Sequence, residues 1–172
     1  MVCPTDTVYG LICDASNSRA VEKIFKIKNR SRTKPLPIFV KDIKMAKQLA
    51  FVGKKQERFL KESWPGAITV ILKAKKKRLS ELVYSSDTIG LRAPDYGLLN
   101  EVLKKIGKPL AQTSANISGR PAATKIKKVL EFIRTIGTSG FPILVVDAGD
   151  LPKNKPSKVV DLTGSSPRVL RD

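Results

Sequence analysis

The chain has 172 residues, 41% of them hydrophobic, which is enough for one globular domain with its own core. Lys and Arg total 33 against 15 Asp and Glu, so the formal net charge is +18. This excess makes polyanions natural partners, although a lysine-rich solvated surface explains it equally well. The absence of His excludes imidazole bases, and Cys3 and Cys13 alone cannot complete a zinc site or form a disulfide framework. No apolar run reaches the ~18 residues that span a bilayer, and the start lacks signal-peptide features, so we expect a soluble, cytoplasmic protein without membrane partners.

Apolar spacing and capping residues predict three helices in the first part of the chain. The first covers Ser18–Lys28 and is capped by Asn17 or Ser18. A short helix runs from its cap Asp42 through Leu49, and Lys54–Ser63 forms the third, which the sequence W-P-G ends. Two further helices are predicted later in the chain, at 98–106 and 124–136.

Between these helices, β-branched and apolar runs predict strands. The extended segments are Pro35–Val40, Ala67–Leu72, Thr88–Ala93, Pro109–Thr113, Ile143–Asp147 and Val159–Leu162. A lysine-rich run, Lys73–Arg78, connects two of them. This alternation predicts an α/β (or α+β) domain with a mixed sheet, and no repeat or linker divides it.

The commonest nucleotide-binding signatures, G-x-x-x-x-G-K-[ST] and G-x-G-x-x-G, do not occur. Polar clusters instead lie near the predicted ends of strands and helices, at 4–11, 28–30 with 34–36, 90–94, 114–119 and 156–161. Their cations, hydroxyls and amides are what a triphosphate and a carboxylate require, and the ends of strands are where α/β proteins usually bind ligands.

Each cluster alone also has an ordinary structural explanation. Lys28 and Arg30 follow a helix, where cations favour the helix dipole, so a solvated helix end explains them too. Arg92 interrupts an apolar strand; if it points inward it needs an anion, and if it points outward it is an edge charge. Thr5 and Thr7 alternate in the manner of one face of a strand, and S-A-N is typical of a turn or a helix cap.

Taken together and in this order, the clusters resemble the YrdC-like family of threonylcarbamoyl-AMP synthases. Members carry P-T-[DE]-T-x-Y-G-L, a K-x-R pair, a later S-x-N, and S-T-V-V-D near the end, and the match runs from Val2 to Asp172. The resemblance implies a single YrdC-like domain over 1–172: a twisted mixed β-sheet with flanking helices around a concave basic cavity.

The resemblance also implies roles for residues on the ATP side of this cavity. Lys28 and Arg30 match the K-x-R pair and are expected to face the ATP phosphates as the catalytic cations. Ser114 and Asn116 are expected to help hold the nucleotide, and Ser157 to reach the same phosphates. If Lys28 and Arg30 are exposed, replacing them with Ala should leave thermal unfolding nearly unchanged.

On the amino-acid side, Thr5 and Thr7 match the first motif, and Arg92 matches an arginine expected to meet an anionic group of substrate or intermediate. Two features depart from the family. Lys158 stands where threonine is common, and the chain starts three residues before Pro4, without the usual preceding helix and start of the first strand. The second departure predicts an exposed sheet edge or open cavity wall near Pro4.

The activity implied by the resemblance joins L-threonine, bicarbonate and ATP into threonylcarbamoyl-AMP and pyrophosphate. Mg²⁺ would be held mainly by the ATP phosphates and water, so no protein ligand is assigned. A tRNA threonylcarbamoyl transferase would be the partner enzyme and would use this product as its substrate.

Two alternatives stay open. The first is the related domain of hydrogenase-maturation carbamoyltransferases, whose acylphosphatase and zinc-finger regions this sequence lacks. The second is a noncatalytic module that binds tRNA or double-stranded RNA weakly through its charge, although 6% aromatic residues argue against stacking on bases.

Overall fold

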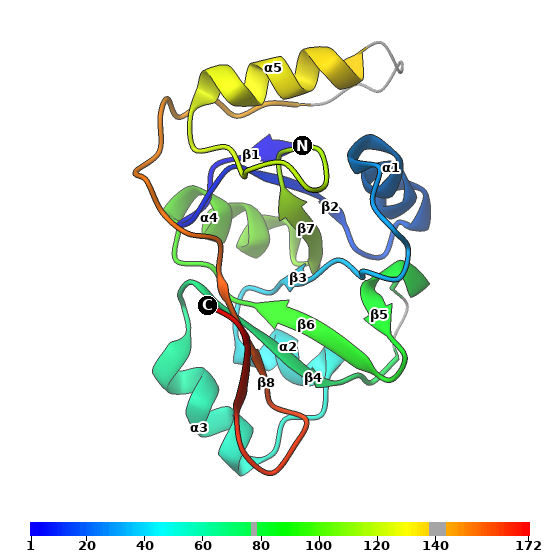
Figure 1. Cartoon of the computed structure of the whole chain (residues 1–172). Coiled ribbons are helices and arrows are strands. Elements are labelled where there is room, and N and C mark those ends of the chain that lie inside the picture. Colours follow the sequence, from blue (N-terminus) through cyan, green and yellow to red (C-terminus); the bar gives the residue numbers. More distant parts are fainter. Residues whose placement is uncertain (77–78, 138–143) are drawn as a thin grey trace.

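A mixed β-sheet runs through the molecule, and the short strand β3 (Ile38–Phe39) joins its two halves (Figure 1). The computed structural model describes residues 1–76, 79–137 and 144–172. Within these ranges the strand order is β1-β2-β7-β3-β6-β4-β8-β9, with β5 paired to β6. Strand β3 is antiparallel to β7 and parallel to β6, and β4 is parallel to β8. The predicted mixed-sheet α/β class is therefore confirmed.

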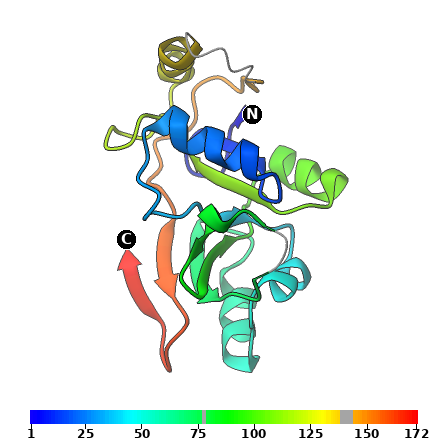
Figure 2. The same cartoon turned by 90° about the vertical axis from the view of Figure 1, so that its right-hand side faces the viewer.

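The remaining strands divide between the two halves. The bounds are β1 (Val2–Cys3), β2 (Gly10–Asp14) and β7 (Leu110–Ser114) on one side, and β4 (Ile68–Lys73), β5 (Tyr84–Ser85), β6 (Thr88–Arg92), β8 (Lys158–Asp161) and β9 (Arg168–Arg171) on the other. Five α-helices and one short 3₁₀ helix are present in the described residues: α1 (Ser18–Lys28), α2 (Ile43–Leu49), α3 (Lys54–Ser63), η1 (Glu81–Val83), α4 (Gly97–Ile106) and α5 (Ile126–Gly137). Helices α1, α4 and α5 accompany the first half, and α2 and α3 accompany the second (Figures 1 and 2).

Helix α1 matters for the site because its C-terminal end points at the strand β7 region. Asn17 caps its N-terminus by accepting a hydrogen bond from the backbone N–H of Ala20, as capping chemistry predicts. The helix ends at Asn29, whose φ of 49° lies in the left-handed region, where Asn is tolerated better than most residues. The apolar face is buried, and Lys28, the last helical residue, is buried with it.

Several local predictions from the sequence are wrong. Strand β2 was not expected, and residues 5–9 form a turn rather than one face of a strand. Of the strand expected at Ile143–Asp147, Ile143 lies outside the described residues, and only Val145 forms an isolated parallel bridge, to Val2. Strand β9 was also missed, because all four of its residues are exposed and show no alternating pattern.

Of the two alternatives expected near Pro4, an exposed sheet edge or an open cavity wall, the exposed edge is wrong, and the open wall stays a prediction. Val2 donates its N–H to the carbonyl of Leu144 at 2.7 Å, and Val146 donates to the carbonyl of Val2 at 2.9 Å. The side chains of Val2 and Cys3 are 0% and 1% exposed. Residues 144–146 thus form hydrogen bonds with the outer edge of β1, so the backbone N–H and carbonyl of Val2 are paired within the chain.

No helix in the described ranges combines the length and apolar content needed to cross a membrane.

Candidate functional site

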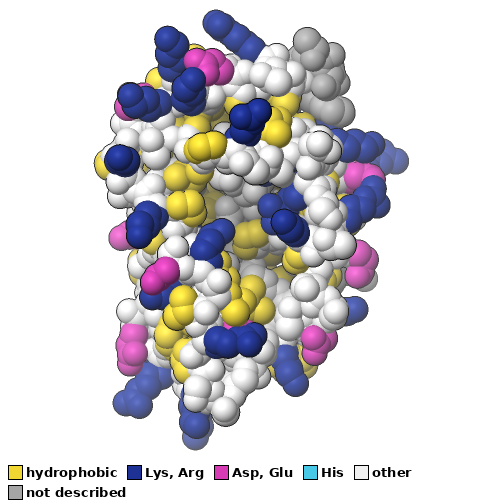
Figure 3. All heavy atoms as spheres, viewed as in Figure 1, with side chains coloured by type: hydrophobic (Ala, Val, Ile, Leu, Met, Phe, Trp, Pro, Cys, Tyr) yellow, Lys and Arg dark blue, Asp and Glu magenta, His cyan; other side chains and the backbone are white. Residues whose placement is uncertain are grey.

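A cavity of about 280 Å³ opens between the two halves of the sheet, close to the lower limit for small-molecule sites. In the space-filling view it corresponds to a hollow in the middle of the face, with Lys and Arg side chains around it (Figure 3). Its walls come from the turn 7–8, Arg30, the segments 35–37 and 156–157, and strands β4, β6, β7, β8 and β9. The cavity is therefore formed by segments that lie far apart in the sequence.

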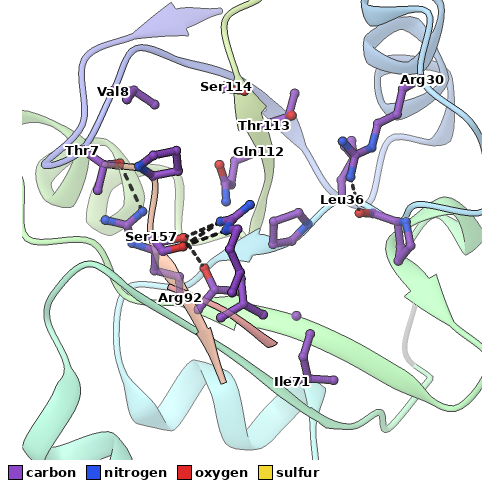
Figure 4. A pocket seen from close by; sticks show the side chains of 17 residues that line it. Thr7, Val8, Arg30, Leu36, Ile71, Arg92, Gln112, Thr113, Ser114 and Ser157 are labelled. Carbon is purple, nitrogen blue, oxygen red and sulfur yellow. Dashed lines mark hydrogen bonds between the residues drawn. The ribbon is translucent and has the colours of Figure 1, made fainter. Parts of the chain in front are cut away.

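Of the described residues that line the cavity, three are cations, Arg30, Arg92 and Arg171, and none is acidic. Arg30 and Arg92 lie on opposite sides of it (Figure 4). Burial lowers the pKa of Arg30, and Arg171 lowers it further by repulsion. Arg171 acts in the same sense on Arg92, where burial is again the larger cause. An anion in the cavity would relieve this repulsion.

Arg92 is buried, with 3% of its side chain exposed, and it pairs with Asp6 at 2.6 Å. The guanidinium also donates to the carbonyl of Gly66 at 2.9 Å and to Thr7 Oγ1 at 3.3 Å, and it lies over the Phe39 ring at 5.8 Å. The inward orientation considered from the sequence is thus the correct one, and the edge-charge alternative is wrong. The anion that Arg92 needs is supplied, at least in part, by the protein itself.

The turn that carries the first motif is held by its own hydroxyls. Thr5 Oγ1 donates to the carbonyl of Val8 at 2.7 Å and accepts from the N–H groups of Thr7 and Val8. Thr7 lines the cavity and contacts Arg92, whereas Thr5 is buried and is not among the lining residues. Direct contact between Thr5 and threonine stays a prediction, and the visible role of Thr5 is to shape the turn that presents Thr7.

The two cations of the K-x-R pair, Lys28 and Arg30, lie in different surroundings. Arg30 is half-buried, lines the cavity, and donates to the carbonyls of Lys34 at 2.7 Å and Pro35 at 3.1 Å. Lys28 is 1% exposed and is absent from the cavity lining. Burial lowers the pKa of Lys28 to about 7, with a smaller effect from Arg30. For Lys28 the solvated-helix-end interpretation is wrong, and its contact with ATP phosphates stays a prediction.

The other residues predicted to bind the nucleotide lie at two places, the end of β7 and the segment that enters β8. Ser114, at the end of β7, lines the cavity, and its Oγ donates to Asn116 Oδ1 at 2.6 Å. Ser157 lines the cavity from the segment that enters β8, and its hydroxyl lies 2.9 Å from Thr69 Oγ1. Lys158, the departure from the family pattern, is not among the lining residues and pairs with Asp172 at 2.9 Å.

Sequence reasoning missed several lining residues, above all Arg171. Its guanidinium donates to the Ser157 carbonyl at 3.2 and 2.7 Å, a contact made possible by the antiparallel pairing of β8 with β9. No local pattern around Arg171 indicated a strand. Thr69, Gln112 and Thr113 were missed because each sits in a strand whose β propensity already explained it.

A profile of the family described as Sua5_yciO_yrdC, telomere recombination, matches residues 1–172. The chain belongs to this family. A threonylcarbamoyl-AMP synthase of Bacillus subtilis is 35% identical over 170 residues, covering 98% of this chain and 48% of that protein. A putative threonylcarbamoyl-AMP synthase of Methanocaldococcus jannaschii is 34% identical over 163 residues, covering 94% of this chain and 73% of that protein.

Solved structures agree with this family membership. Sua5 of Pyrococcus abyssi in complex with L-threonine superposes with a TM-score of 0.87 at 31% identity, covering 98% of this chain and 48% of that one. YciO of E. coli superposes with a TM-score of 0.86 at 28% identity, covering 99% and 81%. The resemblance to the YrdC-like family and the fold it implies are therefore confirmed. The chain spans about half the length of the Bacillus relative and of the Pyrococcus structure.

Proposed function

We propose that the protein is an enzyme that makes threonylcarbamoyl-AMP and pyrophosphate from L-threonine, bicarbonate and ATP, as a nucleotidyltransferase. The observation that carries this proposal is the cavity with Arg30 and Arg171 on its wall and Arg92 already paired to Asp6. The relatives named threonylcarbamoyl-AMP synthase and the threonine complex of the Pyrococcus structure support the same assignment.

The charges suggest how two anionic substrates would share the cavity. Arg92 and Asp6 together are nearly neutral, whereas Arg30 and Arg171 bond to oxygens of uncharged groups in the described chain. The triphosphate, which carries the higher charge, would lie toward Arg30 and Arg171. A singly charged carboxylate would lie toward Thr7 and the remaining donors of Arg92, which agrees with the roles expected for these two residues.

The reaction requires positioning more than a protein nucleophile. The threonine amine and bicarbonate form N-carboxythreonine and water, and an oxygen of the new N-carboxylate group attacks the α-phosphorus of ATP. A new P–O bond forms and the bond to pyrophosphate breaks. The chain would hold the two anions in line and stabilise charge on the departing phosphates, functions that do not depend on the imidazole base that the sequence lacks.

Mg²⁺ enters this proposal as a companion of ATP. Since no acidic side chain is found among the described residues of the cavity wall, a magnesium ion there would be held by phosphate oxygens, water and at most the hydroxyls of Ser114 or Ser157. When bound, Mg²⁺ would neutralise phosphate charge. The proposal further places the protein in the cytoplasm, with a tRNA threonylcarbamoyl transferase as consumer of the product.

Mass spectrometry of the purified protein incubated with ATP, Mg²⁺, bicarbonate and threonine tests the proposal. We expect threonylcarbamoyl-AMP, with pyrophosphate release that needs both bicarbonate and threonine. Equal pyrophosphate release with serine, or without bicarbonate, would contradict the substrate assignment. If well-folded protein gave no product but bound tRNA, the noncatalytic RNA-binding alternative would replace it.

A further inference from the structure

The ammonium group of Lys28 lies among three oxygen atoms of the turn that follows β7. Lys28 Nζ donates to the carbonyls of Ser114 and Asn116, both at 2.6 Å, and to Asn116 Oδ1 at 2.8 Å. An ammonium has three N–H groups, so these acceptors use all of them. Such a group of oxygens at these distances is what a bound monovalent cation would have, and here the cation is tethered to helix α1.

The same residue also holds the turn through its backbone. The carbonyl of Lys28 accepts a hydrogen bond from the N–H of Ser118 at 3.0 Å. The end of α1 therefore contacts the turn 114–118 at both its start and its finish. Because Ser114 lies on the cavity wall, the position of this wall depends on the end of α1 (Figure 4).

The orientation of the Asn116 amide follows from the ammonium. Its Oδ1 accepts from Lys28 Nζ and from Ser114 Oγ at 2.6 Å, which directs its Nδ2 to the carbonyl of Arg120. The hydrogen of Ser114 Oγ is thereby committed, so this hydroxyl can offer a ligand only its acceptor lone pairs. Without the ammonium, the two carbonyl oxygens and Asn116 Oδ1 would lie close together, and the hydroxyl of Ser114 would be the remaining donor among these groups.

We propose that Lys28 is a positioning residue, a tethered cation that fixes the turn 114–118 and so sets Ser114 and Asn116 for the nucleotide; this inference rests on the proposed function. A direct phosphate contact would require Lys28 to give up a buried hydrogen bond and leave a carbonyl without its donor. The placement of Lys28 outside the cavity lining favours the indirect role. Phosphates near Arg30 would favour the ammonium form of Lys28, because negative charge opposes the lowering of its pKa by burial.

Chemical rescue of Lys28→Ala by methylammonium ions tests this role. The matched control is Lys26→Ala, an exposed lysine in the same last turn of α1. Steady-state synthesis gives KM for ATP, KM for threonine and kcat, and calorimetric titration with Mg-ATP measures binding without turnover. Circular dichroism verifies that each variant is folded.

For Lys28→Ala we expect the KM for ATP to rise by about tenfold or more, with kcat at saturating ATP within about threefold of the unsubstituted protein, because ground-state placement of the nucleotide is lost. Methylammonium should return the KM for ATP toward its original value, and Lys26→Ala should not respond. A large fall in kcat with unchanged KM for ATP, or folded Lys28→Ala that methylammonium does not rescue, would overturn the proposal.

A second variant covers the case in which Lys28→Ala does not fold. Asn116→Ala removes one of the three oxygens and leaves helix α1 intact, and it should also weaken Mg-ATP binding. Unchanged Mg-ATP binding by this variant would overturn the positioning role. Failure of the proposed function has a different signature: the unsubstituted protein would form no threonylcarbamoyl-AMP, whereas Mg-ATP titration of the variants would still report on the turn.

Discussion

Two buried cations, Arg92 on strand β6 and Lys28 at the end of helix α1, are satisfied in different ways. Arg92, at the end of β6, pairs with the carboxylate of Asp6, while Lys28, at the end of α1, bonds to three oxygens of uncharged groups. A buried charge without compensation is costly, so each arrangement stabilises its cation. The difference is in what remains if the cation is removed: the partly buried carboxylate of Asp6 in the case of Arg92, and neutral oxygens of Ser114 and Asn116 in the case of Lys28.

The comparison predicts the largest loss of stability for Arg92→Met. This change leaves Asp6, whose side chain is 12% exposed, without its ion-pair partner and with the backbone N–H of Asp95 as a remaining donor, and breaking a buried ion pair costs about 3–5 kcal/mol. The free energy of unfolding from urea denaturation measures the loss. The double variant Asp6→Asn/Arg92→Met should be less destabilised than Arg92→Met alone, since no orphan charge remains. An equal free energy of unfolding for the two variants would mean that the unpaired charge of Asp6 does not cause the loss of stability.

A smaller loss is expected for Lys28→Met. The carbonyls of Ser114 and Asn116 would each lose a donor, and unsatisfied buried polar groups cost about 1–3 kcal/mol. This replaces the expectation of nearly unchanged unfolding, which assumed an exposed side chain. Urea denaturation with exposed Lys26→Met as control measures the difference, and a change of less than ~0.5 kcal/mol would place Lys28 among ordinary surface residues.

The pH dependence of unfolding gives a third contrast. Burial lowers the pKa of Lys28 to about 7 from an ordinary value of 10.5, so between these values the unfolded chain binds more protons. Stability from this group must therefore rise with pH, by roughly 1–2 kcal/mol between about pH 7 and 8.5. Lys28→Met should lose this part of the slope, while Lys26→Met keeps it. Parallel pH profiles for Lys28→Met and the unsubstituted protein would contradict the lowered pKa.

The sequence predicted the helix that carries Lys28, but not where the Lys28 side chain points. The bounds of α1, α2 and α3 were predicted from caps and apolar spacing, because those signals lie within a few residues of each helix. The direction of Lys28 was not available from such signals. It depends on the end of β7 and the turn after it lying beside the end of α1, which is a tertiary fact.

The sequence indicated which motifs form the cavity, but not which residues of each motif line it. Arg30, Arg92, Thr7, Ser114 and Ser157 do line it, whereas Thr5, Lys28 and Asn116 are not among its lining residues. Within one motif some side chains line the cavity and others do not, and only packing decides which do. Arg171 could not have been found locally, since it reaches the site through the pairing of β9 with β8.

For Arg30→Ala we expect little change in stability and a large loss of synthesis. Its side chain is half-buried and bonds only to loop carbonyls in the described chain, so the free energy of unfolding should change by about 1 kcal/mol or less. Product formation should fall strongly, because Arg30 faces the expected phosphate side. The matched control is Arg32→Ala, an exposed arginine paired with Glu22. Full activity of Arg30→Ala would return this cation to the solvated-helix interpretation.

The smallest effect on synthesis is expected from the lysine run Lys73 to Lys77, of which Lys77 lies outside the described residues. Lys73 and Lys76 are exposed and are absent from the cavity lining, so the double variant Lys73→Ala/Lys76→Ala should make threonylcarbamoyl-AMP at the original rate.

If the protein binds tRNA, the same variant should bind it more weakly at low salt. Surface lysines act through counterion release, and removing two phosphate contacts should reduce the salt dependence of log K by about 2. Filter binding of tRNA over a range of salt concentrations measures this slope, and Arg30→Ala should show the reverse pattern, with synthesis lost and the slope nearly unchanged. If the lysine variant lost synthesis while Arg30→Ala kept it, the active site would lie at the end of β4 rather than in the cavity beside β3.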